Sequence, residues 1–176
     1  NGKTDHIWPI ALPDGKSVVF VIWSGSLSTA ELAIASLDDG KTIPLGIQGI
    51  RPLAVLDGML VYLQADGTVM AVKLDGSGRK LAGSPIPVHD PVSVASANNG
   101  NSGVFISPRG ALVTSRGGAR GTLDWVSPSG PTEPLLKQPG AYQLPRLSPD
   151  AQRVAVAVAP VAGEDVRMSD YAHIGL

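Results

Sequence analysis

Three aspartates in recurring turn sequences could serve as metal ligands or as general acids and bases. Asp14 lies in Pro-Asp-Gly, Asp57 in Leu-Asp-Gly and Asp150 in Pro-Asp-Ala. Carboxylates do such chemistry when several of them converge on one point. An aspartate in a tight turn more often accepts hydrogen bonds from the backbone of its own turn. We therefore predict that these carboxylates hold turns, and that the chain has no metal site.

Other candidate metal ligands lack the necessary spacing. The acidic stretches 38–40 and 75–78 have neither the alternating ligands nor the closing glutamate of a calcium loop, so hairpin turns are predicted there. His6, His89 and His173 are isolated, with no His-x-His or His-Glu-x-x-His spacing, and His6 is expected to be a structural or surface residue.

Nucleophilic catalysis finds little support in the sequence. The chain has no cysteine, which excludes thiol catalysis, disulfides and cysteine-ligated zinc. No Gly-x-Ser-x-Gly nucleophile elbow occurs, although a triad of residues distant in sequence is set by geometry and stays open. We predict no catalytic residue and no cofactor.

Arg116 and Arg120 are the best candidates for binding residues. With Arg109 they form a small basic stretch interleaved with glycines, which could hold an anion or an acidic partner. The alternative is a solvated hairpin tip. The tryptophans at 8, 23 and 125 could anchor a partner, but their positions in strand-like runs favour packing between sheets.

Composition limits the class of protein. The chain has 176 residues, of which 43% are apolar and 16% charged, enough for one domain with a buried core. Its net charge of −1 gives no electrostatic case for binding nucleic acid or an anionic membrane. No apolar run approaches the roughly 18 residues of a membrane span.

A repeat positions the turns. The turn residue falls at 14, 57, 109 and 150, with spacings of 43, 52 and 41 residues. Pro9, Pro52 and Pro145 each lie five residues before their aspartate, whereas the third copy has Val104 there. Each unit reads as strand, turn, strand, loop, strand, turn and short outer strand. A four-stranded antiparallel unit of about 40–45 residues is typical of a β-propeller blade.

The sequence thus predicts an all-β fold, a single β-propeller domain spanning residues 1–176. Its four recognisable blades cover approximately 6–46, 47–90, 91–138 and 139–176. The third strand of the last blade is expected at 165–170, which leaves that blade without its outer strand. Three outcomes stay open: a closed small ring, half of a larger dimeric ring, or a fragment of a longer propeller.

Two stretches, Leu-Pro-Asp-Gly-Lys-Ser-Val-Val-Phe at 12–20 and Leu-Ser-Pro-Asp-Ala-Gln-Arg-Val-Ala-Val at 147–156, have a familiar form. With Ala-Ser-Leu-Asp-Asp-Gly at 35–40, they resemble TolB-like and WD-like bacterial β-propeller repeats. Leu56 and Arg109 depart from the proline and aspartate of that pattern.

Residues 6–9, 66–71 and 140–145 extend the likeness to repeats fused behind bacterial serine/threonine kinase domains, although no kinase motif is present. The resemblance implies a non-catalytic scaffold that binds a protein or peptide, in an extracytoplasmic or periplasmic location. The alternative functions are a hydrolase or lactonase-type propeller enzyme, or the accessory propeller of a peptidase. A homodimer that completes the propeller is a further expectation.

Overall fold

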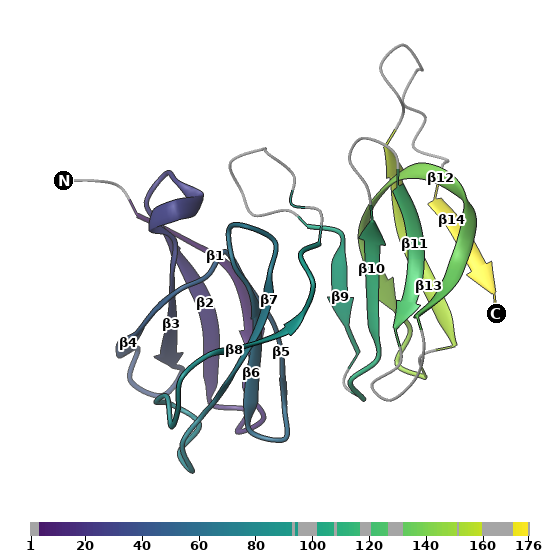
Figure 1. The fold of residues 1–176 in the computed structure, drawn as a ribbon. Coiled ribbons are helices and arrows are strands. Elements are labelled where there is room, and N and C mark those ends of the chain that lie inside the picture. Colours follow the sequence, from purple (N-terminus) through teal and green to yellow (C-terminus); the bar gives the residue numbers. More distant parts are fainter. Residues whose placement is uncertain are drawn as a thin grey trace. The chain divides into compact units, whose positions relative to one another are not determined.

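The computed structural model describes residues 4–92, 94, 102–107, 109–116, 121–126, 132–150, 152–159 and 171–175. Its strands pair antiparallel (Figure 1). Side chains at 115, 116, 137, 143, 144, 159 and 171–175 are outside this description. The chain forms two compact units, one built mainly from residues 1–91 and the other mainly from residues 101–176. Among the described residues the one helical element is a 3₁₀ turn at Leu27–Thr29, so the predicted all-β class is confirmed.

The first unit contains two four-stranded antiparallel sheets, each with the strand number and pairing predicted for a blade. The first sheet has the order β1-β2-β3-β4 and the second the order β5-β6-β7-β8. Their strands are β1 Asp5–Ala11, β2 Ser17–Trp23, β3 Glu31–Ser36, β4 Thr42–Gln48, β5 Arg51–Leu56, β6 Met59–Leu63, β7 Val69–Lys73 and β8 Ile86–His89.

The middle strands of these sheets are buried on both faces. Side chains alternate between the two faces of a strand, yet Val19, Phe20 and Val21 in β2 are all buried, as are the three consecutive residues 32–34 in β3. The outer strands β4 and β8 are largely exposed. Each sheet therefore needs cover on both faces, as sheets stacked into a propeller provide.

The two sheets meet at Gly49, in the connection between β4 and β5. The Cγ of Leu32 and the Cδ2 of Tyr62 each lie 2.9 Å from the point that a Cβ on Gly49 would occupy. Both of these side chains are fully buried. A glycine is therefore required here for close approach, and it lets β3 of one sheet pack against β6 of the other.

The recurring prolines coincide with irregularities in the first strand of a blade. The pairing register shifts between Ile7 and Ile10 around Pro9, next to Pro52, and around Pro145. Proline has no N–H to donate and is tolerated at sheet edges and bulges. The strand containing Val104, which has no proline, pairs without a shift.

Arginine–aromatic contacts link adjacent first strands in each unit. The guanidinium carbon of Arg51 in β5 lies 4.4 Å from the ring centroid of Trp8 in β1, and that of Arg146 lies 5.3 Å from the ring of Phe105. Such cation–π contacts contribute on the order of 0.5–2 kcal/mol each. Trp8 has a φ of 56°, a left-handed conformation that is uncommon for a non-glycine residue.

The second unit is one six-stranded sheet with the order β14-β13-β12-β11-β10-β9. Its strands are β9 Val104–Ile106, β10 Leu112–Arg116, β11 Gly121–Val126, β12 Thr132–Leu147, β13 Arg153–Ala159 and β14 Tyr171–Gly175. The long strand β12 changes partner within its length. It pairs with β11 up to Gly140 and with β13 from Ala141, so one strand serves as the outer strand of one blade and the first strand of the next.

The last blade consists of the second half of β12, then β13 and β14. The strand that pairs with β13 is β14, further along the chain than the third strand expected at 165–170, residues that lie outside the described ones.

Substitution of Gly49 by alanine tests the contact between the first two sheets. We expect Gly49→Ala to lower the free energy of unfolding by about 1–3 kcal/mol, because its Cβ would overlap two buried side chains. Gly83→Ala is the control, since a Cβ there meets nothing within 4 Å. Chemical denaturation of both variants makes the comparison, and equal stabilities would contradict the close packing.

Candidate functional site

Hydrogen bonds within its own turn engage the Asp14 carboxylate. Its Oδ1 accepts from the amides of Lys16 and Ser17, both at 2.9 Å, and its Oδ2 accepts from the Ser17 hydroxyl, also at 2.9 Å. This turn joins β1 to β2, and the predicted structural role of Asp14 is therefore confirmed.

Other turns of the chain use the same device. Asp39, Asp66 and Asp150 each accept a hydrogen bond from the amide two residues further along. Asp150 also accepts one from the Ser148 hydroxyl. Asp57 differs, because it and Gly58 both have positive φ and form a two-residue turn between Leu56 and Met59, as in a type I′ hairpin.

Contacts within the turns lower the pKa of Asp14, Asp39, Asp75 and Asp150. The amide of Lys16 is the main cause of a lowered pKa at Asp14, and the hydroxyls of Ser77 and Ser148 lower the pKa of Asp75 and Asp150. The Lys41 side chain, whose Nζ is 3.0 Å from Oδ2 of Asp39, holds the pKa of Asp39 at about 2. The lowered pKa values follow from contacts within each turn. They are not a sign that several carboxylates converge on one point.

The remaining sequence candidates are dispersed. His6 in β1 has its ring centroid 4.7 Å from that of Phe20, and Nδ1 of His89 lies 2.7 Å from the carbonyl oxygen of Asp90. Arg116 ends β10, but its side chain lies outside the described part of the structure, as does the whole of Arg120. Their binding role stays a prediction.

Trp8 makes the contact between sheets that was expected of the tryptophans, whereas Trp23 and Trp125 pack within their own units. Trp23 is buried at the end of β2, Trp125 packs against the core formed by Val113, Leu123 and Val154, and Trp8 stacks with Arg51.

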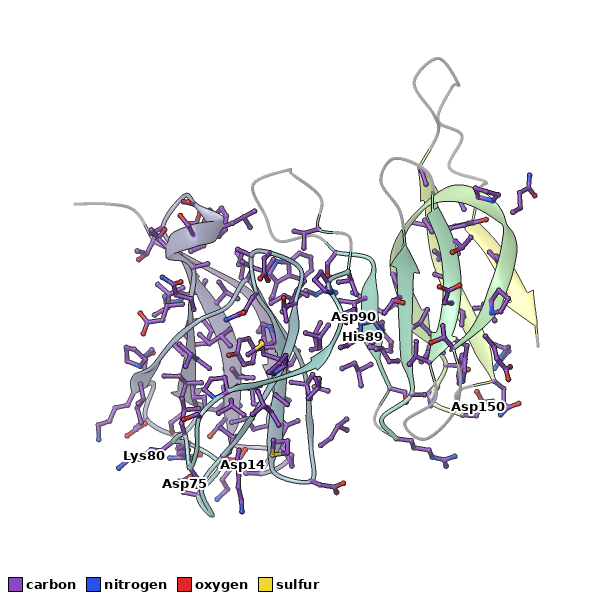
Figure 2. The ribbon with its side chains drawn as sticks, in the orientation of Figure 1. Asp14, Asp75, Lys80, His89, Asp90 and Asp150 are labelled. Carbon is purple, nitrogen blue, oxygen red and sulfur yellow. The ribbon has the colours of Figure 1, made fainter. Side chains whose placement is uncertain are left out.

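A pocket of about 610 Å³ opens at one end of the first unit. Asp14 and Asp75 lie at this end (Figure 2). Its apolar lining comes from Leu12, Pro13, Val55 and Leu74, and its polar lining from Asp14, Lys73, Asp75 and Ser77, with Gly58, Gly76 and Gly78 completing the wall.

This pocket could not be found from the sequence. Asp75 and its neighbours read as a hairpin turn, which they are, since the Gly78 amide donates to the Asp75 carbonyl at 2.8 Å. What the sequence does not reveal is that this turn lies beside the β1–β2 turn of the preceding blade. Arg79 Nη2 approaches Asp14 Oδ2 to 3.9 Å across that junction.

Two buried hydroxyls lack a hydrogen-bond partner in the described structure, those of Tyr62 and Thr114. Burial raises the pKa of Tyr62. Within the ranges described above, no three histidine, aspartate or glutamate side chains gather as a metal site would require. No helix among those residues is long and apolar enough to span a membrane.

Comparisons with solved structures show the fold. A calcium-binding protein, regucalcin, from Agrobacterium tumefaciens matches with a TM-score of 0.60 and 17% identity, covering 91% of this chain and 55% of that one. A puromycin-hydrolyzing peptidase from Mycobacterium tuberculosis matches with a TM-score of 0.62 and 18% identity, over 88% of this chain and 25% of that one. The Cps50 (Swd1) β-propeller domain of Myceliophteria thermophila matches with a TM-score of 0.51 and 9% identity, over 97% and 57%.

The fold is therefore that of β-propeller blades. The chain spans about half the length of regucalcin and a quarter of the peptidase. A scan against known protein families found no match, and neither did a search of curated protein sequences.

Acid should weaken the Asp14 turn. Hydrogen bonds lower the folded-state pKa of this carboxyl, so its stabilisation is fully present above the unfolded pKa of 3.8 and is lost as the pH falls through the lower folded value. Asp14→Ala should therefore destabilise the protein at neutral pH and much less near pH 2. Thermal unfolding of the wild-type protein and of Asp14→Ala, measured from neutral pH down to pH 2, checks this prediction.

The control for this experiment is Asp14→Asn, which keeps an oxygen acceptor for the Lys16 and Ser17 amides. It should retain more stability at neutral pH than Asp14→Ala. An Asp14→Ala effect that is equally large at both ends of the pH range would show that the carboxylate charge does not contribute.

Proposed function

We propose that this chain is a non-catalytic binding scaffold that recognises a protein or peptide partner. The observation that carries the proposal is the use of its turn carboxylates. Asp14, Asp39, Asp75 and Asp150 each accept hydrogen bonds that fix turns at the ends of strands. Rigid sheets with fixed turns make a recognition surface.

Further details of the proposal rest on the sequence resemblance. The blades are of the TolB-like and WD-like type, from a protein similar to those that carry repeats behind kinase domains, in an extracytoplasmic location. Arg116 and Arg120 contribute to the binding face. The four blades act as one domain, and a second copy of the chain completes the ring.

A second candidate function is that of an enzyme, or of the accessory propeller of a peptidase. The match to part of the puromycin-hydrolyzing peptidase, with a TM-score of 0.62, favours the accessory form. In that case the chain would guide a peptide substrate, and the hydrolytic residues would belong to other parts of the longer protein.

Peptide selection tests the binding function. The immobilised protein is exposed to a phage library of random dodecapeptides, and several rounds should enrich a shared sequence pattern. Rigid turns favour this result because little conformational entropy is lost on binding. The purified protein is assayed in parallel against ester, lactone and aminoacyl-amide substrates. Turnover without peptide enrichment would contradict the proposal and support the enzyme.

A further inference from the structure

The pocket in the first unit combines apolar lining residues with a fixed charge. Among its lining residues, Leu12 and Leu74 are buried and Val55 is half-buried. Its volume of about 610 Å³ lies in the range usual for sites that bind small molecules or side chains. The residues come from both sheets of one compact unit, so the pocket belongs to the packed structure.

The negative charge of Asp75 is held in place by its turn. Oδ1 accepts from the Ser77 hydroxyl at 2.7 Å and from the amides of Arg79 and Lys80 at 3.1 and 3.3 Å. These hydrogen bonds all go to Oδ1 and leave acceptor positions on Oδ2. The carboxylate therefore offers a fixed acceptor beside an apolar surface.

The positive charges near the pocket are less constrained. The Arg79 guanidinium lies beside Asp14, with Nη2 3.9 Å from Oδ2. Lys73 is exposed, forms no ion pair within the described residues, and its ammonium is carried on a flexible four-carbon chain that can turn into solvent. The charges held in fixed positions at the pocket are therefore the carboxylates of Asp14 and Asp75. Asp14 already has the Arg79 guanidinium beside it, which leaves Asp75 as the carboxylate available to a ligand.

We propose that this pocket binds a peptide segment in which an apolar side chain stands next to a basic one. The apolar side chain contacts Leu12, Val55 and Leu74, and the basic group pairs with Asp75. An acidic segment is disfavoured because it would place like charges together. The inference rests on the proposed binding function and adds to it the place of binding and the chemistry of the partner.

Three blocked hexapeptides test the site directly. They carry Leu-Arg, Leu-Glu or Ala-Arg at their centre, flanked by glycine and serine, and are titrated into the ¹⁵N-labelled full chain. The Leu-Arg peptide should shift the amide resonances of Leu12, Asp14 and residues 73–78 and bind about fivefold more tightly than either alternative. Equal binding of Leu-Arg and Leu-Glu, or shifts confined to other residues, would overturn the inference.

Two pairs of variants isolate the contributions of charge and space. Asp75→Asn keeps the Oδ1 acceptor of the turn but removes the charge, and should abolish the preference for Leu-Arg over Leu-Glu. Asp39→Asn is its control in a similar turn that does not line the pocket. Gly76→Trp should block binding, whereas Gly83→Trp should not. A Cβ meets nothing within 4 Å at either glycine, and only Gly76 lines the pocket.

The outcomes separate this inference from the broader function. If phage selection enriches peptides whose binding is unchanged by Asp75→Asn and Gly76→Trp, the pocket is wrong and the scaffold function stands. If no library peptide is enriched and no hexapeptide binds at millimolar concentration, both proposals are overturned. Thermal unfolding of each variant confirms that lost binding is not lost folding.

Discussion

Burial of the middle strands on both faces is the constraint on which the rest of the structure depends. Three consecutive side chains in β2 and three in β3 are removed from water, so the first sheet cannot be stable with one face exposed. A second sheet must cover it, and Gly49 allows that sheet to approach closely enough for Leu32 and Tyr62 to pack. Stacked antiparallel sheets, the arrangement of propeller blades, meet this requirement.

The edges and turns of the sheets are adapted to that stacking. Prolines occupy first strands where a donor is not needed, and the register shifts there, while arginine–aromatic contacts join neighbouring first strands in each unit. Aspartates close the turns with their own carboxylates. The carboxylates of these turn aspartates therefore stabilise the backbone of their own turns.

The sequence predicts the sheets well because their determinants are local. Turn residues recur at blade spacing, apolar runs mark the doubly buried strands, and the absence of proline at Val104 accompanies the regular pairing of β9. The strand expected at 165–170 lies outside the described residues, and the strand that pairs with β13 is β14 at Tyr171–Gly175. The pocket and the Trp8–Arg51 contact escaped prediction because each depends on which residues of one sheet face the next. A single sequence carries no such information.

The contact between the first two sheets can be measured without any ligand. In a ¹³C-edited nuclear Overhauser experiment on the full chain, the methyl groups of Leu32 should show strong cross-peaks to the ring protons of Tyr62. They should also show cross-peaks to the α protons of Gly49, because both side chains approach that glycine. Assigned spectra without these cross-peaks, from a protein whose β2 and β3 amides are protected from exchange, would contradict the stacking of the two sheets.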